Sequence, residues 1–285
     1  MKDNKIQTEK RHQRRVRYKG THPRTFAEKY KEHNPEKYKE TIEKVIRKGS
    51  TPAVNINFKD IDKVAEKYGP FDFVLADLGV SSMQIDDPRR GFTYKHEGPL
   101  DLRLNPKQGI SASERIQNIT QDELEGMFIE NSDEPYAYEI AKMIMKERRK
   151  KKIETTLELK NIVEKAVLQS KDVKNMSNRD KDETVKKSCA RVFQALRIDV
   201  NNEFEVLYEF LEKLPSVLAP QGKAVILTFH SGEDRLVKKS FKSLKNAGVY
   251  QEIARDVIRP KREECHRNPR AKSTKMRWAV KNLKF

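Results

Sequence analysis

The chain has 285 residues and a formal net charge of +17, and hydrophobic and charged residues each make up 36% of it. This length suits one large domain or two modest ones, and no stretch reaches the roughly 18 uncharged apolar residues of a membrane span. Cys189 and Cys265 are far apart and lack metal-ligand spacing, which argues against a disulfide framework or a zinc site. We therefore expect a cytoplasmic protein with no membrane and no metal.

The excess positive charge lies at the two ends of the sequence. Residues 1–52 carry 16 Lys and Arg against 7 Asp and Glu, residues 255–285 carry 11 against 3, and the rest carries 33 of each sign. Aromatic and rigid residues interrupt the cations in RRVRYKGTHPRTF and RNPRAKSTKMRW, which is typical of segments that bind a nucleic-acid backbone. Solvated flexible tails are the alternative interpretation.

The first third of the chain alternates apolar runs with glycine and proline breaks. The pattern predicts a disordered basic start at 1–20 and a mostly polar helix at 23–48. It then predicts a short strand at 54–58, a second helix at 59–69 and a buried strand at 71–80. The last of these strands becomes polar at its carboxyl end, as a parallel strand does when it opens onto a site.

The remainder indicates a helical module followed by more α/β structure. Residues 81–110 are expected to form a loop and residues 111–190 helices, with Thr155 and Glu158 in a capping box. The run RRKKK at 148–152 is expected to be a solvated helix end that could also contact phosphate.

The chain then returns to a sheet. A helix at 200–218, a Pro-Gln-Gly turn and a strand at 223–229 predict a parallel α/β unit, and 276–283 is expected to be a final edge strand. Insertion of a helical module after a parallel strand is sterically easy, because loops there leave the sheet edge freely.

Few residues stand out as candidates for chemistry. Asp77 is expected at the carboxyl tip of a buried strand, where open α/β sheets bind ligands, or else it caps the next turn. His230 follows another strand on the same edge, as a ligand-contacting group or as a satisfied strand-end histidine. Both are weak catalytic candidates. A serine hydrolase is disfavoured, because Ser81 and Ser82 have no general base nearby in the sequence.

Four long strings resemble the RsmH/MraW-type 16S rRNA (cytosine-N4)-methyltransferases. They are ADLGVSSMQIDDPRRGFTYKHEGPLDLRLNP (76–106), ARVFQALRIDVNNEFEVLYEFLEKLP (190–215), LAPQGKAVILTFHSGEDRLVKKSFK (218–242) and NPRAKSTKMRWAV (268–280). The resemblance covers most of 55–285, and the block RRVRYKGTHPR…GSTPA resembles an extension found in one subgroup of that family.

The resemblance implies an α/β protein with a class I, Rossmann-like methyltransferase sheet and an inserted helical domain. It implies methyl transfer from S-adenosylmethionine to the N4 amine of a cytidine in the decoding region of the small ribosomal subunit, so 16S rRNA is the expected partner. Carried over by motif, Phe58, Asp77 and Gln84 are the expected cofactor-binding residues. Phe92 and Tyr94 are candidates for stacking on the splayed base, or for core packing. The oligomeric state is not indicated.

One part of the family's pattern has no counterpart in this sequence. A class I methyltransferase begins with a strand, a glycine-rich turn and a second strand that ends in a ribose-binding acid. None of the 11 glycines here lies within two positions of another, and a single residue, Ala53, separates Pro52 from Val54 where two or three βα units are expected. We therefore expect a sheet truncated at its N-terminal half, weak or no S-adenosylmethionine binding, and an unpaired apolar edge.

The predicted organisation is a basic N-terminal extension at 1–52, a partial methyltransferase core formed by 53–110 with 191–285, and a helical insert at 111–190. The leading hypothesis is an rRNA methyltransferase that is impaired in this chain. The alternatives are an internally deleted gene product, a catalytically inactive rRNA-binding paralogue, and a cofactor site completed by another subunit.

Overall fold

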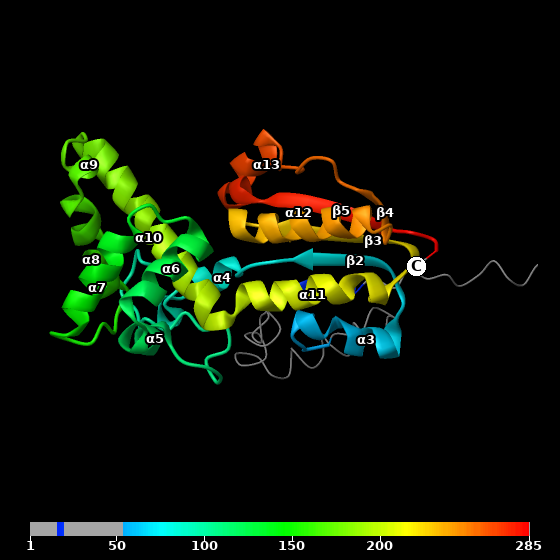
Figure 1. Ribbon diagram of the computed structural model, residues 1–285, viewed down its shortest axis with the longest axis horizontal. Coiled ribbons are helices and arrows are strands. Elements are labelled where there is room, and N and C mark those ends of the chain that lie inside the picture. Colours follow the sequence, from blue (N-terminus) through cyan, green and yellow to red (C-terminus); the bar gives the residue numbers. More distant parts are fainter. Residues whose placement is uncertain (1–15, 20–53, 285) are drawn as a thin grey trace, which may run out of the picture. The chain divides into compact units, whose positions relative to one another are not determined.

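A computed structural model describes residues 16–19 and 54–284 (Figure 1). The chain divides into two compact units, one made of Met1–Gly79 with Leu207–Phe285 and the other of Val80–Val206. The helix predicted at 23–48 lies outside the described residues. No described helix is long and apolar enough to cross a membrane.

The first unit is built on a five-stranded sheet with the spatial order β1-β2-β3-β5-β4. Strands β1, β2 and β3 are parallel, whereas β5 runs antiparallel to both of its neighbours. The sheet is the Rossmann-like α/β sheet that the sequence predicts. The strands are β1 (Val16–Lys19), β2 (Phe71–Asp77), β3 (Leu218–Thr228), β4 (Tyr250–Ile253) and β5 (Lys275–Lys281).

Two strand predictions are wrong. The segment 54–58 is not a strand, because the side chain of Asn57 accepts a hydrogen bond from the Lys59 amide and starts a 3-10 helix at Phe58–Asp60. The final strand, β5, is not at the edge, because β4 pairs with its outer side. Its central position agrees with the burial of Ala279 and Val280, but order along the chain does not reveal order in a sheet.

The edge of β2 also differs from the prediction. Residues 16–19, expected to be disordered, form β1 and pair in parallel with β2 from Val74 to Asp77. The apolar edge that we expected to be unpaired is therefore covered along the carboxyl half of β2, so that its main-chain groups find partners there.

Helices α3 (Ile61–Tyr68) and α12 (Ser231–Asn246) pack in the same unit. Helix α3 buries Ile61 and Val64 on one face and ends at Gly69, as its apolar spacing predicts. In α12, the ring of Phe241 packs edge-on against Tyr250 of β4 with ring centroids 5.5 Å apart. The unit also contains α13 (Arg262–Arg267) and the short helix Pro269–Ser273, while α11 (Glu203–Val217) begins in one unit and ends in the other.

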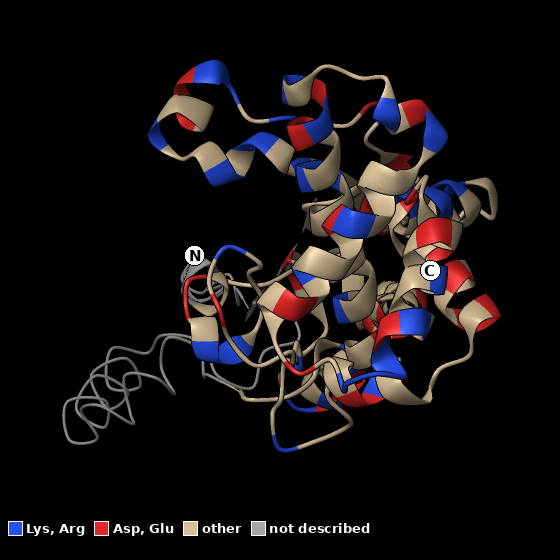
Figure 2. Cartoon of the chain, turned by 90° about the vertical axis from the view of Figure 1, so that its left-hand side faces the viewer, with Lys and Arg blue, Asp and Glu red and all other residues tan. Residues whose placement is uncertain are grey.

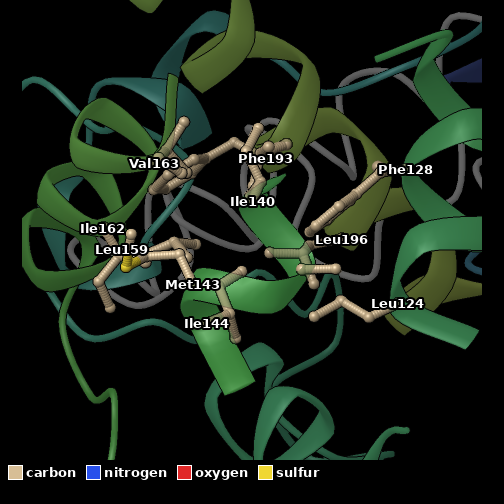
Figure 3. Packing of buried hydrophobic residues seen from close by; sticks show 14 of the residues in the cluster. Leu124, Phe128, Ile140, Met143, Ile144, Leu159, Ile162, Val163, Phe193 and Leu196 are labelled. Atoms are coloured by element: carbon tan, nitrogen blue, oxygen red, sulfur yellow. The ribbon is translucent and has the colours of Figure 1, made fainter. Parts of the chain in front are cut away.

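The second unit consists of helices around a hydrophobic core (Figure 3). Leu124, Phe128, Ile140 and Leu196 are among its buried side chains. The predicted capping box is confirmed, since Thr155 and Glu158 bond each other's backbone at the start of α8. Its helices are α4 (Ser82–Ile85), Pro88–Arg90, α5 (Ala112–Asn118), α6 (Gln121–Ser132), α7 (Ala137–Arg148), α8 (Thr156–Gln169), α9 (Lys171–Lys174) and α10 (Asn178–Asn201).

The second unit is longer than the insert that the sequence suggests at 111–190. It reaches back to Val80 because Leu100 and Leu102, in the supposed loop, are buried in the helical core. It reaches forward to Val206 because α10 is one helix of 24 residues that crosses position 190 without a break.

Cysteine reactivity reports on the integrity of this core. Burial raises the pKa of the Cys189 thiol to about 12, so almost no thiolate is present near pH 8. In the Cys265→Ser variant, we expect a thiol reagent to modify Cys189 only after denaturant is added, while the Cys189→Ser variant reacts at once through Cys265. Rapid modification of native Cys265→Ser, followed by absorbance, would contradict the buried placement.

Candidate functional site

The carboxyl ends of β2 and β3 form the edge at which the sequence places a site. Asp77 is the last residue of β2, and it stands in register with Leu227 of β3 and with Lys19 of β1. The Leu78 amide donates to the Leu227 carbonyl at 3.1 Å, which prolongs the pairing by one residue. His230 comes two residues after the end of β3, so the fold brings Asp77 and His230 to the same edge of the sheet.

A glycine permits the turn that leaves this edge. Gly79 has a φ of +83°, which side chains rarely tolerate, and a Cβ there would lie 3.4 Å from the ring of Phe229. The chain therefore departs from β2 through a left-handed residue that packs closely against the end of β3.

His230 is held at the start of α12. It is the N-cap residue, and its Nδ1 accepts a hydrogen bond from the Glu233 amide at 3.4 Å. Glu233 is only 4% exposed, and its carboxylate accepts from the Phe229 amide at 2.8 Å while lying 3.3 Å from His230 Nε2. His230 thus caps an amide of the first helical turn, while Glu233 binds the amide of the residue just before the N-cap, an arrangement similar to a capping box.

A partly buried ion pair joins the same helix to the sheet. Arg277 of β5 contacts both carboxylate oxygens of Asp234, with nitrogen–oxygen distances of 2.7 and 3.2 Å. Because two parallel contacts join the guanidinium to the carboxylate, they fix both the distance between α12 and β5 and the orientation of the two side chains. The sequence suggests only that Glu233 and Asp234 favour the helix dipole, because nothing in it connects position 234 with a strand more than 40 residues further on.

Phe58 packs against α11. Its side chain is 5% exposed, and its ring meets Phe210 edge-on with centroids 5.2 Å apart. Lys213 of the same helix donates to the Lys59 carbonyl at 3.0 Å and pairs with Asp62 at 3.0 Å. Helix α3, which follows the short helix at Phe58–Asp60, runs opposite to β2 (Figure 1).

Gln84 lies in the second unit and has an unusual hydrogen-bond balance. It is 6% exposed, and its Oε1 accepts from the Ser81 amide at 2.7 Å. Its buried Nε2 has no hydrogen-bond partner among the described residues. Because a buried donor without an acceptor is costly, this amide suits a ligand that presents an acceptor to it.

The two aromatic candidates for base stacking adjoin the helical core. Tyr94 packs at a tilt on Phe193 with centroids 5.5 Å apart, and burial raises the pKa of its hydroxyl. The ring of Phe92 lies 5.5 Å from the guanidinium of Arg90. Both residues remain partly exposed, so packing covers only part of each ring. Their role in base stacking stays a prediction.

Asp77 and Gln84 each have a feature that suits a cofactor, within their own units. The carboxylate of Asp77 stands at the carboxyl edge of the sheet, and the Nε2 of Gln84 has no acceptor among the described residues. Strand β1 is the outermost strand of the described sheet, and the sequence holds no glycine-rich turn. The roles of Phe58, Asp77 and Gln84 toward a cofactor therefore stay predictions.

A partly parallel sheet, with a helical unit inserted in the chain after β2, defines the class as a Rossmann-like methyltransferase fold. Within that class, the sequence matches the model of the MraW methylase family over residues 12–282. The chain belongs to that family.

Three similar proteins are named as ribosomal RNA small subunit methyltransferases H. The chain is 51% identical to ribosomal RNA small subunit methyltransferase H 1 of Lachnoclostridium phytofermentans, over 95% of this chain and 93% of that protein. It is 48% identical to the protein of the same name from Agathobacter rectalis, over 96% and 99%. It is 46% identical to ribosomal RNA small subunit methyltransferase H 2 of Alkaliphilus metalliredigens, again over 96% and 99%.

The alignments extend beyond the length of this chain. The Lachnoclostridium alignment spans 347 residues, whereas this chain has 285. That relative therefore has residues with no counterpart here, and the absence of βα units after Pro52 stays a prediction.

The cap at His230 generates a prediction about its role. Replacing an N-cap side chain with alanine typically costs about 0.5–2 kcal/mol, whereas asparagine retains an acceptor. We expect His230→Ala to lower the free energy of unfolding in urea by about 1 kcal/mol, and His230→Asn to restore most of it. If His230→Asn is as unstable as His230→Ala, the side chain does not act as a simple cap.

Proposed function

We propose that this chain is, by descent, a methyltransferase that acts on the N4 amine of a cytidine in 16S rRNA of the small ribosomal subunit. The observation that carries the proposal is the family match over residues 12–282, which includes the edge with Asp77. The names of its relatives support the small-subunit rRNA as substrate.

The carboxyl edge of the sheet suits the chemistry of a cytosine amine. That nitrogen is a poor nucleophile because its lone pair is delocalised into the ring. An acceptor that bonds its protons can localise the lone pair on nitrogen and later take a proton. Asp77 is the carboxylate at this edge that could do so, although contact with the cofactor is the other role proposed for it.

S-adenosylmethionine, when bound, supplies the methyl group. The Nε2 of Gln84 would donate to an acceptor of the cofactor, because Ser81 already engages the other end of the amide. Asp77 and Phe58, which belong to the sheet unit, are the other two residues that we propose to contact the cofactor. Methyl transfer needs in-line approach, so the positioning of both reactants would supply much of the rate.

We further propose that the chain binds this cofactor weakly. Half of a class I cofactor site comes from the glycine-rich turn and from the acid after the second strand, and the sequence has no such turn. This same gap supports a second function, that of a catalytically inactive rRNA-binding protein.

Calorimetric titration with S-adenosylmethionine, together with transfer of a tritiated methyl group to undermethylated small subunits, separates the two functions. We expect weak cofactor binding and slow methyl transfer. Binding to the subunit without any binding of cofactor would reject the catalytic proposal and favour the second. Binding to neither would leave an internally deleted, inactive product.

A substitution tests the site itself. Gln84→Glu keeps an acceptor for the Ser81 amide but removes the Nε2 donor, so we expect S-adenosylmethionine affinity to fall about tenfold, as for one hydrogen bond of 1–1.5 kcal/mol. Gln108→Glu makes the same change of charge at an exposed position and serves as the control. Equal loss in both variants would show a general charge effect.

A further inference from the structure

The most exposed side chains along α7 are an aromatic ring and cations. Tyr138, Lys142 and Lys146 are the exposed residues of this helix, and the exposed Arg149 follows at its C-cap. Steps of four, four and three place them along one side of a helix. The stripe is about 16 Å long at 1.5 Å per residue, and it contains no carboxylate.

The stripe continues into the turn between α7 and α8. Lys150, Lys151 and Lys152 are all more than half exposed. The stripe, the turn and Lys165, which also reaches Glu147, bring seven cations to one region. Three carboxylates pair with the lysines of this region, namely Glu147, Glu154 and Glu158.

The carboxylates are already engaged by these lysines. Glu147 lies 2.9 Å from Lys150 and 3.4 Å from Lys165, and the pKa of Glu147 falls below its ordinary value mainly because of Lys150. One carboxylate therefore serves two cations. The region keeps a positive excess that its own acids do not neutralise, and closely spaced like charges favour an external anion.

The backbone beneath these cations is firmly anchored. Ile153 is buried, and its carbonyl accepts from the Ser113 hydroxyl at 2.6 Å. The Glu154 carbonyl accepts from the Leu100 amide at 2.8 Å. A turn held in this way presents its side chains without a large cost in backbone ordering when a ligand binds.

Arg148 has a different task from its neighbours. Its guanidinium nitrogen donates to the carbonyls of Ile116 and Ile119, at 2.5 and 2.6 Å. It therefore ties the end of α7 to the end of α5. The run RRKKK thus divides into one cation that stabilises the fold and four that face solvent.

We propose that Tyr138, Lys142, Lys146, Arg149 and the turn 150–152 form an RNA-binding surface of the helical unit. The cations would contact phosphates, and the Tyr138 ring would stack on a base, the combination by which proteins hold single-stranded nucleic acid. Tyr138 is 49% exposed, and Lys142 Nζ lies 5.5 Å from its ring centroid. The inference rests on the proposed function, because it takes small-subunit rRNA as the polyanion.

An RNA fits this surface better than a membrane does. Tyr138 is the only exposed large hydrophobic side chain from α7 through α8 in the part of the chain described, so the surface has no apolar face to insert into lipid. Figure 2 shows that Lys and Arg and Asp and Glu both occur on many helices of the chain. The segment 171–183 has four cations and four carboxylates, which provides a matched control.

The test uses the full chain and a fragment of small-subunit rRNA, with binding followed by fluorescence anisotropy over a range of KCl concentrations. For single strands, the slope of log affinity against log salt changes by about 0.7 per phosphate contact. For Lys142→Gln/Lys146→Gln/Arg149→Gln, we expect the slope to shrink by about 2 and the affinity at low salt to fall about 10- to 100-fold. The control Lys171→Gln/Lys174→Gln/Arg179→Gln should change both by much less.

Tyr138 is tested separately. Loss of one stacked base typically weakens binding by about 5- to 100-fold, so Tyr138→Ala should lower the affinity without changing the salt slope, and Tyr138→Phe should retain it. Thermal melts of all variants exclude misfolding. An unchanged slope and affinity in the α7 triple variant, or an equal loss in the control, would overturn the inference.

The outcomes also separate this inference from the proposed function. If the wild-type chain binds small-subunit rRNA and the α7 variants bind equally well, the inference fails and the proposed function stands. The wild-type chain could bind an unrelated RNA as tightly, with the triple variant losing its binding to both RNAs. The proposal of an RNA-binding surface would then stand, and the proposed preference for small-subunit rRNA would fail. The same variants are also tested for binding to phosphatidylserine vesicles. If the α7 triple variant lost binding to these vesicles but not to RNA, the surface would be assigned to membranes instead.

Discussion

The parallel pairing of β2 with β3 is the constraint on which the rest of the first unit depends. Val74, Ala76, Ala224 and Ile226 are buried along this pair, and the register aligns Asp77 with Leu227. Because both strands end at the same edge, whatever follows them is brought there too. The turn at Gly79 and the start of α12 are both consequences of that alignment.

The other edge of β2 is covered by a short strand from the N-terminal part of the chain. A strand edge cannot stay bare without cost, and the four residues of β1 cover the carboxyl half of β2. In doing so, β1 occupies the position beside Asp77. The main chain is satisfied, but a four-residue strand is not the glycine-rich turn that a class I cofactor site uses.

The helical unit does not depend on that half of the sheet. Its core is formed by its own residues, including Leu100 and Leu102 from the segment before α5, and it holds the α7–α8 turn through Ile153 and Arg148. The surface that we assign to RNA therefore requires only contacts within Val80–Val206. The proposed RNA-binding surface and the sheet edge with Asp77 therefore belong to different units of the chain.

The sequence by itself determined the class of fold, the helical insertion, the capping box at Thr155 and the placement of Asp77 and His230 at strand ends. Each of these follows from local periodicity or from long strings of residues. Only the tertiary structure decided which strand is at the edge, that β1 covers β2, and that Asp234 pairs with Arg277. Those features join residues distant in sequence, and a linear pattern carries no information about which distant segments meet. The same holds for Arg148 and Arg149, adjacent and alike in sequence, of which one ties two helices together and the other faces solvent.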